Sequence, residues 1–118
     1  MAGKTSRDLM RGSMDLMVLA TLLDEAKYGY LIQQRLSESS GGLVKLQAGT
    51  LYPLLHKLED EKLIRSRWDK SSGRRRKWYE LTATGRKRLK QQAHQWNEYA
   101  EFLRKLLSPV LEAPPRPA

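Results

Sequence analysis

Leucines recur at helical spacing in the middle of the chain, between residues 47 and 62. They occupy positions i, i+3, i+4 and i+7 of one helical face, at Leu51, Leu54, Leu55 and Leu58. The opposite face carries Thr50, Tyr52, His56, Lys57 and Glu61. This pattern predicts a helix that packs by its leucines and presents a polar face outward. Because proline is tolerated only in a first turn, the helix begins either at Thr50 as N-cap or near Ala48 with a distortion at Pro53.

Two stretches of alternating polarity follow this helix, at residues 64–69 and 74–81. In the first stretch, Ile64, Ser66 and Trp68 are predicted to share one face, with Arg65 and Arg67 on the other. On the return strand, Tyr79 and Leu81 are predicted to point to the core face. The turn between the stretches contains Gly73, which accommodates a positive φ. The sequence therefore predicts a helix followed by a hairpin, the recognition helix and wing of a winged helix-turn-helix.

Two further helices are predicted before this unit, over residues 6–23 and 28–39. Ser6 can cap the first helix. The apolar residues of this helix form one stripe for the core, at Leu16, Leu19, Leu22 and Leu23. A second apolar stripe lies at Met10, Met14 and Met17. A helix that is apolar on two sides favours a subunit interface, although a fully buried core helix is the alternative. In the second helix we expect Tyr30 or Leu31, Ile32 and Leu36 to point inward. Residues 43–46 form an apolar link or a short strand.

The last predicted helix covers residues 83–107, with Thr82 as its N-cap. Its apolar seam has the spacing of a coiled coil, at Leu89, Ala93, Trp96, Ala100, Leu103 and Leu107. A long helix with such a seam favours pairing with a second copy and with the methionine stripe of the first helix. The alternative is a helix that folds back on its own domain. The proline-rich end, residues 109–118, is expected to be disordered.

The length of 118 residues fits one domain with a modest core. The predicted fold class is mainly α with a small β hairpin, a winged helix-turn-helix domain plus a C-terminal dimerisation helix. We expect a flexible N-terminus at residues 1–5, the DNA-binding domain at 6–82, the dimerisation helix at 83–108 and the tail at 109–118.

Basic residues outnumber acidic ones by 22 to 13, which leaves a net charge of +9. Nine of the basic residues and only four acidic ones fall between residues 57 and 77. This clustering favours a polyanionic partner, nucleic acid or an acidic membrane surface, over a generally basic protein. The membrane alternative is disfavoured because it needs a basic amphipathic helix with free apolar surface, and the seam uses that surface for dimerisation.

The chain has no cysteine, which excludes disulfides, thiolate zinc sites and a cysteine nucleophile. His56 and His94 lie on different predicted elements, without the spacing of metal ligands or of a nucleophile and its base. We therefore expect no enzyme, no cofactor and no metal. The N-terminus lacks the apolar core of a secretion signal, and no apolar run approaches the roughly 20 residues that span a bilayer. A soluble protein of the cytoplasm is expected.

The chain resembles the PadR-like transcriptional regulators of bacteria, in particular the short class with a single C-terminal helix. The matching residues are Tyr28-Gly29-Tyr30, Gly49-Thr50-Leu51-Tyr52-Pro53, Leu55, Leu58-Glu59, Leu63-Ile64, Gly73-Arg74-Arg75, Lys77, Tyr79, Leu81-Thr82 and Gly85. Trp96 stands where short members also place a tryptophan. The resemblance implies a homodimeric repressor that releases its operator when a small molecule or another signal arrives. One departure is that the family often has a glycine near the end of the recognition helix, whereas residues 61–63 contain none.

For DNA binding we expect three groups of residues to act together. Thr50, Tyr52, His56 and Lys57 would enter the major groove. Lys27 and Tyr30 would hold phosphates, while Arg74, Arg75, Arg76 and Lys77 would follow the adjacent backbone or minor groove. Two copies would read the half-sites of a palindromic double-stranded operator, roughly 34 Å apart. The rival hypothesis is a winged-helix module for protein binding or for non-specific packaging of nucleic acid.

The predicted dimer seam also suggests an effector site. Small residues beside a large aromatic ring and flexible methionines could enclose a planar hydrophobic ligand, with Met14, Ala93, Trp96 and Ala100 as its lining. A closed interface without a ligand is the equally weighted alternative.

Overall fold

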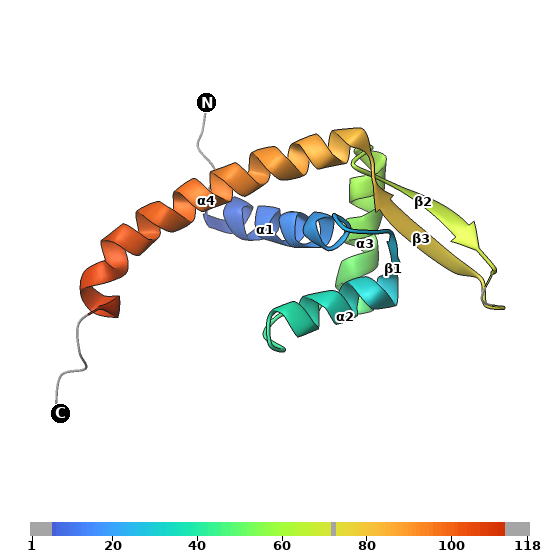
Figure 1. Cartoon of the computed structure of the whole chain (residues 1–118), viewed down its shortest axis with the longest axis horizontal. Helices are drawn as coiled ribbons and strands as arrows, with labels where there is room; N and C mark the ends of the chain where they lie inside the picture. Colours follow the sequence, from blue (N-terminus) through green and yellow to red (C-terminus); the bar gives the residue numbers. More distant parts are fainter. Residues whose placement is uncertain (1–5, 72, 113–118) are drawn as a thin grey trace.

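The computed structural model describes residues 6–71 and 73–112, with side chains from residue 13 onward. Its elements follow the order α1 (Ser6–Thr21), β1 (Lys27–Tyr28), α2 (Gly29–Ser39), α3 (Ala48–Asp60), β2 (Ile64–Asp69), β3 (Arg76–Leu81) and α4 (Ala83–Leu111). The strands form one antiparallel sheet in the order β1-β3-β2. In Figure 1 the β2–β3 hairpin projects from one end of the helical body and α4 extends toward the other end. This is the predicted winged-helix arrangement with a C-terminal helix.

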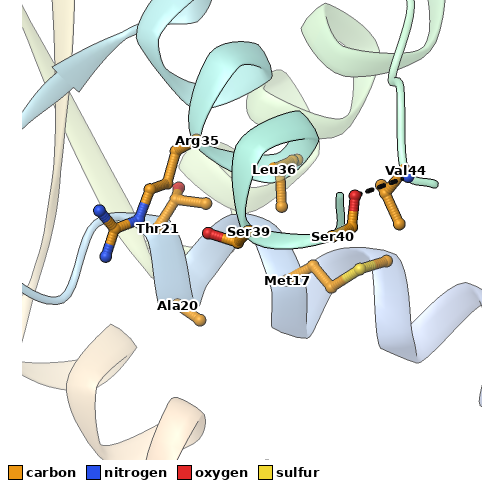
Figure 2. Close-up of a pocket in the computed structure, with 8 residues that line it drawn as sticks. All are labelled: Met17, Ala20, Thr21, Arg35, Leu36, Ser39, Ser40 and Val44. Carbon is orange, nitrogen blue, oxygen red and sulfur yellow. Dashed lines mark hydrogen bonds between the residues drawn. The ribbon is translucent and has the colours of Figure 1, made fainter. Parts of the chain in front are cut away.

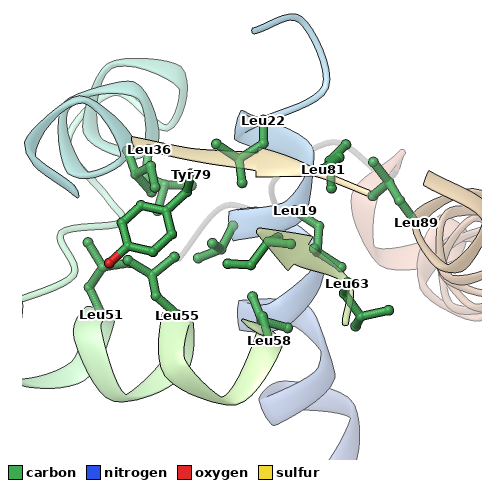
Figure 3. Close-up of a cluster of buried hydrophobic side chains, with 13 residues drawn as sticks. Leu19, Leu22, Leu36, Leu51, Leu55, Leu58, Leu63, Tyr79, Leu81 and Leu89 are labelled. Atoms are coloured by element: carbon green, nitrogen blue, oxygen red, sulfur yellow. The ribbon is translucent and has the colours of Figure 1, made fainter. Parts of the chain in front are cut away.

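The core lies between α1, α2, α3 and the inner face of the sheet (Figure 3). Three of the four leucines on α3 are fully buried, while Leu54 is partly buried at the edge of the cluster. Tyr79 from β3 fills the space above Leu51 and Leu55. The helical spacing of these leucines therefore predicted the packed face of α3 correctly.

The stripe predicted for α1 is wrong at its end. Leu19 and Leu22 are buried as expected, but Leu23 is 55% exposed. The helix ends at Thr21, so Leu23 no longer follows the helical period. The fully buried Val18 is the core residue that the stripe omitted.

The recognition helix begins at Ala48 and continues through Pro53, the later start at Thr50 being wrong. Its end contains the departure from the family pattern. Lys62 adopts φ +65°, a left-handed conformation that side chains rarely adopt and that glycine adopts freely. The conformation is kept because the N–H groups of Lys62 and Leu63 donate to the carbonyls of Glu59 and Leu58, each at 3.0 Å.

The sheet has one strand more than the predicted hairpin. Tyr28 and its neighbour Lys27 form β1, which pairs with Trp78 and Tyr79 of β3. The return strand begins at Arg76 rather than at residue 74, and the apolar link at residues 43–46 forms no strand. Gly73 has the expected positive φ, at +78°.

Helix α4 starts as predicted, with the Thr82 hydroxyl accepting a hydrogen bond from the Gly85 N–H at 2.9 Å. Gly85 packs so closely on the Leu63 carbonyl that a Cβ would overlap it. The expected end at residue 107 is wrong, because α4 continues through Pro109 to Leu111. Proline cannot donate to the Lys105 carbonyl, and the Ser108 hydroxyl donates to it instead at 3.2 Å. The rest of the predicted tail, residues 113–118, lies outside the described residues, as do residues 1–5.

Candidate nucleic-acid interface

The outward face of α3 carries the polar side chains expected to read DNA. Thr50, Tyr52, His56 and Lys57 are all exposed. The ring of Tyr52 lies against Gly29 at the start of α2, where a Cβ would overlap the Tyr52 hydroxyl. Gly29 therefore allows close contact between the two helices of the helix-turn-helix. This contact positions Tyr52 at the edge of the reading face.

The arginines of the wing lie on aromatic rings. The Arg75 guanidinium sits 4.2 Å from the centre of the Trp68 ring, and that of Arg76 lies 4.5 Å from the centre of the Tyr28 ring. Tyr28 is itself held edge-on by Trp78, with ring centroids 5.0 Å apart. A ring face restrains a cation without neutralising it. None of the ion pairs among the described residues involves Arg74, Arg75 or Arg76, so their charge remains available to an anion.

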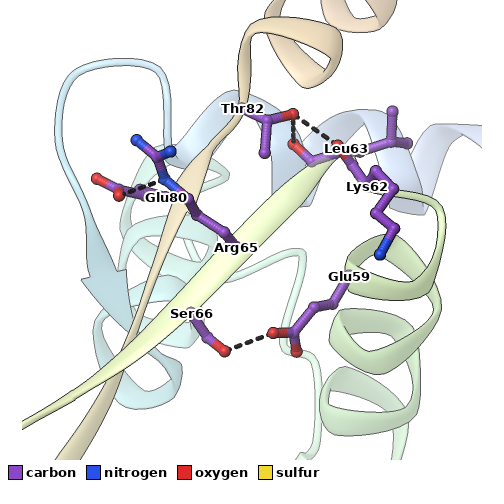
Figure 4. Close-up of polar contacts among 7 residues, drawn as sticks. All are labelled: Glu59, Lys62, Leu63, Arg65, Ser66, Glu80 and Thr82. Atoms are coloured by element: carbon purple, nitrogen blue, oxygen red, sulfur yellow. Dashed lines mark hydrogen bonds and ion pairs between the residues drawn. The ribbon is translucent and has the colours of Figure 1, made fainter.

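The base of the wing is joined to α3 through Glu59 (Figure 4). Its carboxylate accepts a hydrogen bond from the Ser66 hydroxyl at 2.5 Å and lies 3.8 Å from the Lys77 ammonium. Burial raises the pKa of Tyr79, and the nearby Glu59 carboxylate raises it further. Lys77 therefore faces α3 and shares its charge with Glu59, unlike the three arginines before it.

A single groove of about 440 Å³ separates the reading face of α3 from the wing. It brings together six of the predicted DNA-contacting residues, namely Tyr30, Tyr52, His56, Arg75, Arg76 and Lys77. Tyr28 and Trp68 also line it, and sequence reasoning missed both. Their signal was the alternation of aromatic and basic residues across the hairpin, where Trp68 stands directly opposite Lys77.

Lys27 does not belong to this surface, contrary to the sequence-based expectation. It is only 5% exposed, and its ammonium lies 2.7 Å from a carboxylate oxygen of Asp24. That hydrogen bond lowers the pKa of Asp24. Lys27 is confined because it forms part of β1, the strand that the sequence did not reveal.

Lys57 is exposed but it is also paired. Its ammonium lies 2.8 Å from Asp15 Oδ2 on α1. Lys57 therefore stands on the α1 side of the reading face, whereas Tyr52 and His56 line the groove toward the wing. The pairing was not predictable from either local pattern, because the two residues are 42 positions apart.

Comparison with known proteins agrees with this architecture. Residues 18–91 match the model of the transcriptional regulator PadR-like family. The chain belongs to this family. A transcriptional regulator of Mycobacterium tuberculosis is 32% identical over 94 residues, which cover 80% of this chain and 85% of the relative.

Solved structures of similar proteins extend the match to three dimensions. A PadR family transcriptional regulator from Eggerthella lenta is 34% identical with a TM-score of 0.72, covering 86% of this chain and 87% of its own. A transcriptional regulator from Clostridium thermocellum is 28% identical with a TM-score of 0.75, covering 83% and 96%. Membership makes this chain a DNA-binding transcriptional regulator of the winged-helix type, a class whose members are typically not enzymes.

The residues predicted for the dimer seam of this PadR-like chain fall into two groups. Leu89 is 7% exposed and belongs to the core of its own domain, so its assignment to the seam is corrected. Farther along α4, Ala93 is exposed and Trp96 and Ala100 are half-buried, while Leu103 and Leu107 are 39% and 42% exposed. The first turns of α4 bury Leu89 because they pack on the winged-helix domain.

The four residues predicted for an effector lie on α1 and α4. Met14 is half-buried on α1, as is Met17, while the side chain of Met10 lies outside the described residues. Met17 lines a cavity of about 380 Å³ between α1 and α2, together with Arg35, Leu36 and Val44 (Figure 2). None of Met14, Ala93, Trp96 and Ala100 lines this cavity.

Two other kinds of feature, a metal site and a membrane-spanning helix, are absent from the described part of the PadR-like chain. Among the side chains that the structure describes, at residues 13–71 and 73–112, no three histidine or acidic groups come together as metal ligands. Over residues 6–71 and 73–112, no helix combines the length and apolar character needed to cross a bilayer.

Proposed function

We propose that this chain is a homodimeric repressor that binds a palindromic operator in double-stranded DNA and releases it in response to a small planar hydrophobic effector or another signal. The observation that carries the DNA-binding part is the groove between α3 and the wing, where polar and aromatic side chains face arginines that pair with no acidic residue in the described part of the chain. When α3 lies in the major groove, the DNA phosphate backbone that borders this groove passes between α3 and the wing. There it meets the positive charges and the aromatic ring faces of the groove in the protein.

In this proposal α3 enters the major groove by its exposed face, with Thr50, Tyr52 and His56 nearest the bases. Tyr30 is 61% exposed at the start of α2, and its hydroxyl donates a hydrogen bond to a phosphate. The wing arginines lie along the adjacent backbone or minor groove. Lys27 has no part in this interface because its side chain is buried and its ammonium is paired with the Asp24 carboxylate.

Dimerisation is supported by the second half of α4. Its exposed large apolar side chains are Tyr99, Phe102, Leu103, Leu106, Leu107, Val110 and Leu111. Such a continuous apolar stripe on one helix favours burial against a partner over exposure to water. We propose that the partner is a second copy, joined along Trp96, Ala100, Leu103 and Leu107, with Met14 and Met17 of α1 beside them. The half-buried Trp96, Ala100 and Met14 would then border the effector, next to Ala93.

The rival functions are protein binding and packaging of nucleic acid. The wing arginines, which have no acidic partner among the described residues, argue against a module for protein binding. Such a module would be expected to present an acidic surface, whereas the arginines attract nucleic acid. Packaging predicts equal affinity for every sequence. The regulator is proposed to act in the cytoplasm.

The test is fluorescence anisotropy with duplex from upstream of the chain's own gene and with a shuffled duplex as control. Each is measured at about 50 and 200 mM salt, a range that costs phosphate-dominated binding orders of magnitude. A preference of about a hundredfold or more for the native duplex, with one dimer bound per site, is expected. Equal affinity for both duplexes would favour packaging, and no binding to either at low salt would refute DNA binding. Light scattering of the free protein measures the dimer independently.

A further inference from the structure

Asp15 and Lys57 join the middle of α1 to the reading face of α3. The Lys57 ammonium donates a hydrogen bond to Asp15 Oδ2 at 2.8 Å. The Lys57 side chain is 46% exposed, whereas the side chain of Asp15 is only 13% exposed. The carboxylate is therefore part of the protein interior, and the lysine reaches inward to it from the surface.

Asp15 depends on this lysine. Its second oxygen, Oδ1, is buried and has no hydrogen-bond partner among the side chains described, those of residues 13–71 and 73–112. Across the described residues Lys57 is the one cation paired with this carboxylate. If Lys57 turned to a phosphate, a nearly buried carboxylate would be left without its counter-charge, which is far more costly than opening a pair in water.

Lys57 is nevertheless placed to contact DNA. On a helix with 3.6 residues per turn, Thr50, Pro53 and Lys57 lie on one stripe at i, i+3 and i+7. All three are exposed. A lysine on this stripe reaches the phosphates that border a major groove occupied by α3.

We propose that Asp15 restrains Lys57 and thereby lowers the affinity of this chain for DNA. The inference rests on the proposed DNA binding and adds a residue on α1 that controls it. A phosphate and Asp15 compete for the same ammonium, so any displacement of α1 that opens the pair releases one more cation to DNA. Helix α1 contacts both α2 and α4, and Met14 and Met17 flank this region of α1.

The first experiment compares Asp15→Asn with the wild-type protein by anisotropy over a series of salt concentrations. The substitution removes the carboxylate charge and keeps the shape of the side chain. We expect binding about fivefold tighter for each subunit. The gain is the ion pair that the released Lys57 forms with a phosphate, and about fivefold is the upper range for an ion pair at a surface. The slope of log K against log salt should steepen by about 0.9 per subunit, because one more phosphate is neutralised.

Glu38→Gln is the matched control, because it removes one negative charge from an exposed residue of α2 that has no cationic partner among residues the structure describes. It should alter the affinity less than twofold and leave the slope unchanged. An equal gain in Glu38→Gln would mean that net charge, not release of Lys57, strengthens binding, and it would overturn the proposal.

The second experiment removes the lysine, and its arm in the wild-type background does not depend on the folding of Asp15→Asn. In the wild-type background Lys57→Ala should leave the salt slope unchanged, since the ammonium is held by Asp15. In the Asp15→Asn background the same substitution should abolish the gain in affinity. A slope that falls by about 0.9 per subunit on Lys57→Ala alone would show that Lys57 already contacts phosphate, and the restraint would be refuted.

The outcomes also separate this inference from the proposed function. If the wild-type protein binds no duplex, DNA binding itself fails. If it binds its operator and Asp15→Asn is equal or weaker, only the role of Asp15 fails.

Discussion

The ring of Trp68 offers a way to test whether the wing acts through arginines held in place. Trp68→Ala removes the face on which the Arg75 guanidinium lies, 4.2 Å from the ring centre. The ring is 55% exposed, so its loss removes little core packing. A cation–π contact at an exposed site contributes about 0.5–1 kcal/mol. Without the ring, the Arg75 side chain must be ordered when DNA binds. If this ordering costs the energy of the lost contact, the affinity for DNA should fall about two- to fivefold for each subunit.

The salt dependence separates the ring from the cation. Trp68→Ala leaves the charge of Arg75 in place, so the slope of log K against log salt should stay at its wild-type value. Arg75→Ala removes one phosphate contact and should reduce the slope by about 0.9 per subunit. Lys87→Ala is the matched control for charge, because Lys87 is an exposed cation on α4 outside the groove. Trp68→Phe keeps a ring face and should recover most of the affinity.

Two results would refute this reasoning. If Trp68→Ala reduces the slope as much as Arg75→Ala, the ring is needed for the charge to reach DNA at all, not merely to order it. If Trp68→Ala binds as tightly as the wild-type protein while Arg75→Ala is weaker, the contact with the ring has no energetic role in the complex. A loss of equal size in Trp68→Phe would indicate that the indole itself touches DNA.

Three further variants test the fold and the assembly. Lys62→Gly should raise the free energy of unfolding by about 1 kcal/mol, because glycine adopts the left-handed conformation freely; chemical denaturation measures it, with Lys62→Ala as the control that keeps the strain. Gly85→Ala should destabilise by about 1–3 kcal/mol, because its Cβ would overlap a backbone carbonyl, whereas Gly49→Ala meets no atom within 4 Å and should not destabilise. Leu103→Glu combined with Leu107→Glu should convert a dimer to a monomer in light scattering and weaken operator binding, and an unchanged mass would contradict the proposed seam.

The sequence predicted the helices well because their apolar positions are periodic. Leu51, Leu55 and Leu58 follow a helical period, and all three are fully buried. The strand β1 has only two residues, which is too short to carry any period, and it becomes a strand only because β3 passes beside it. The end of α4 was predicted too early because a proline normally ends a helix. Here the Ser108 hydroxyl donates the hydrogen bond that the proline cannot, so the helix continues.

The candidate site was predictable as a group of residues but not in its internal pairing. The run of basic residues at 74–77 identified the wing, and the polar face of α3 identified the reading surface. Which cation is free depends on residues distant in the sequence. Lys57 meets Asp15 at a separation of 42 positions, and Lys77 meets Glu59 across the junction between α3 and the sheet. A local pattern contains no information about such pairs.

The net charge of +9 therefore overstates the charge that this chain can offer to DNA. Lys27 is buried on Asp24, Lys57 is held by Asp15 and Lys77 lies near Glu59, so each of these three cations already has an anion. Arg75 and Arg76 are held instead by the uncharged rings of Trp68 and Tyr28. Counterion release depends on cations that reach phosphates, not on the total charge. The salt slope of operator binding should accordingly follow the arginines of the wing, whereas Lys27, Lys57 and Lys77 should contribute only when their acidic partners are removed.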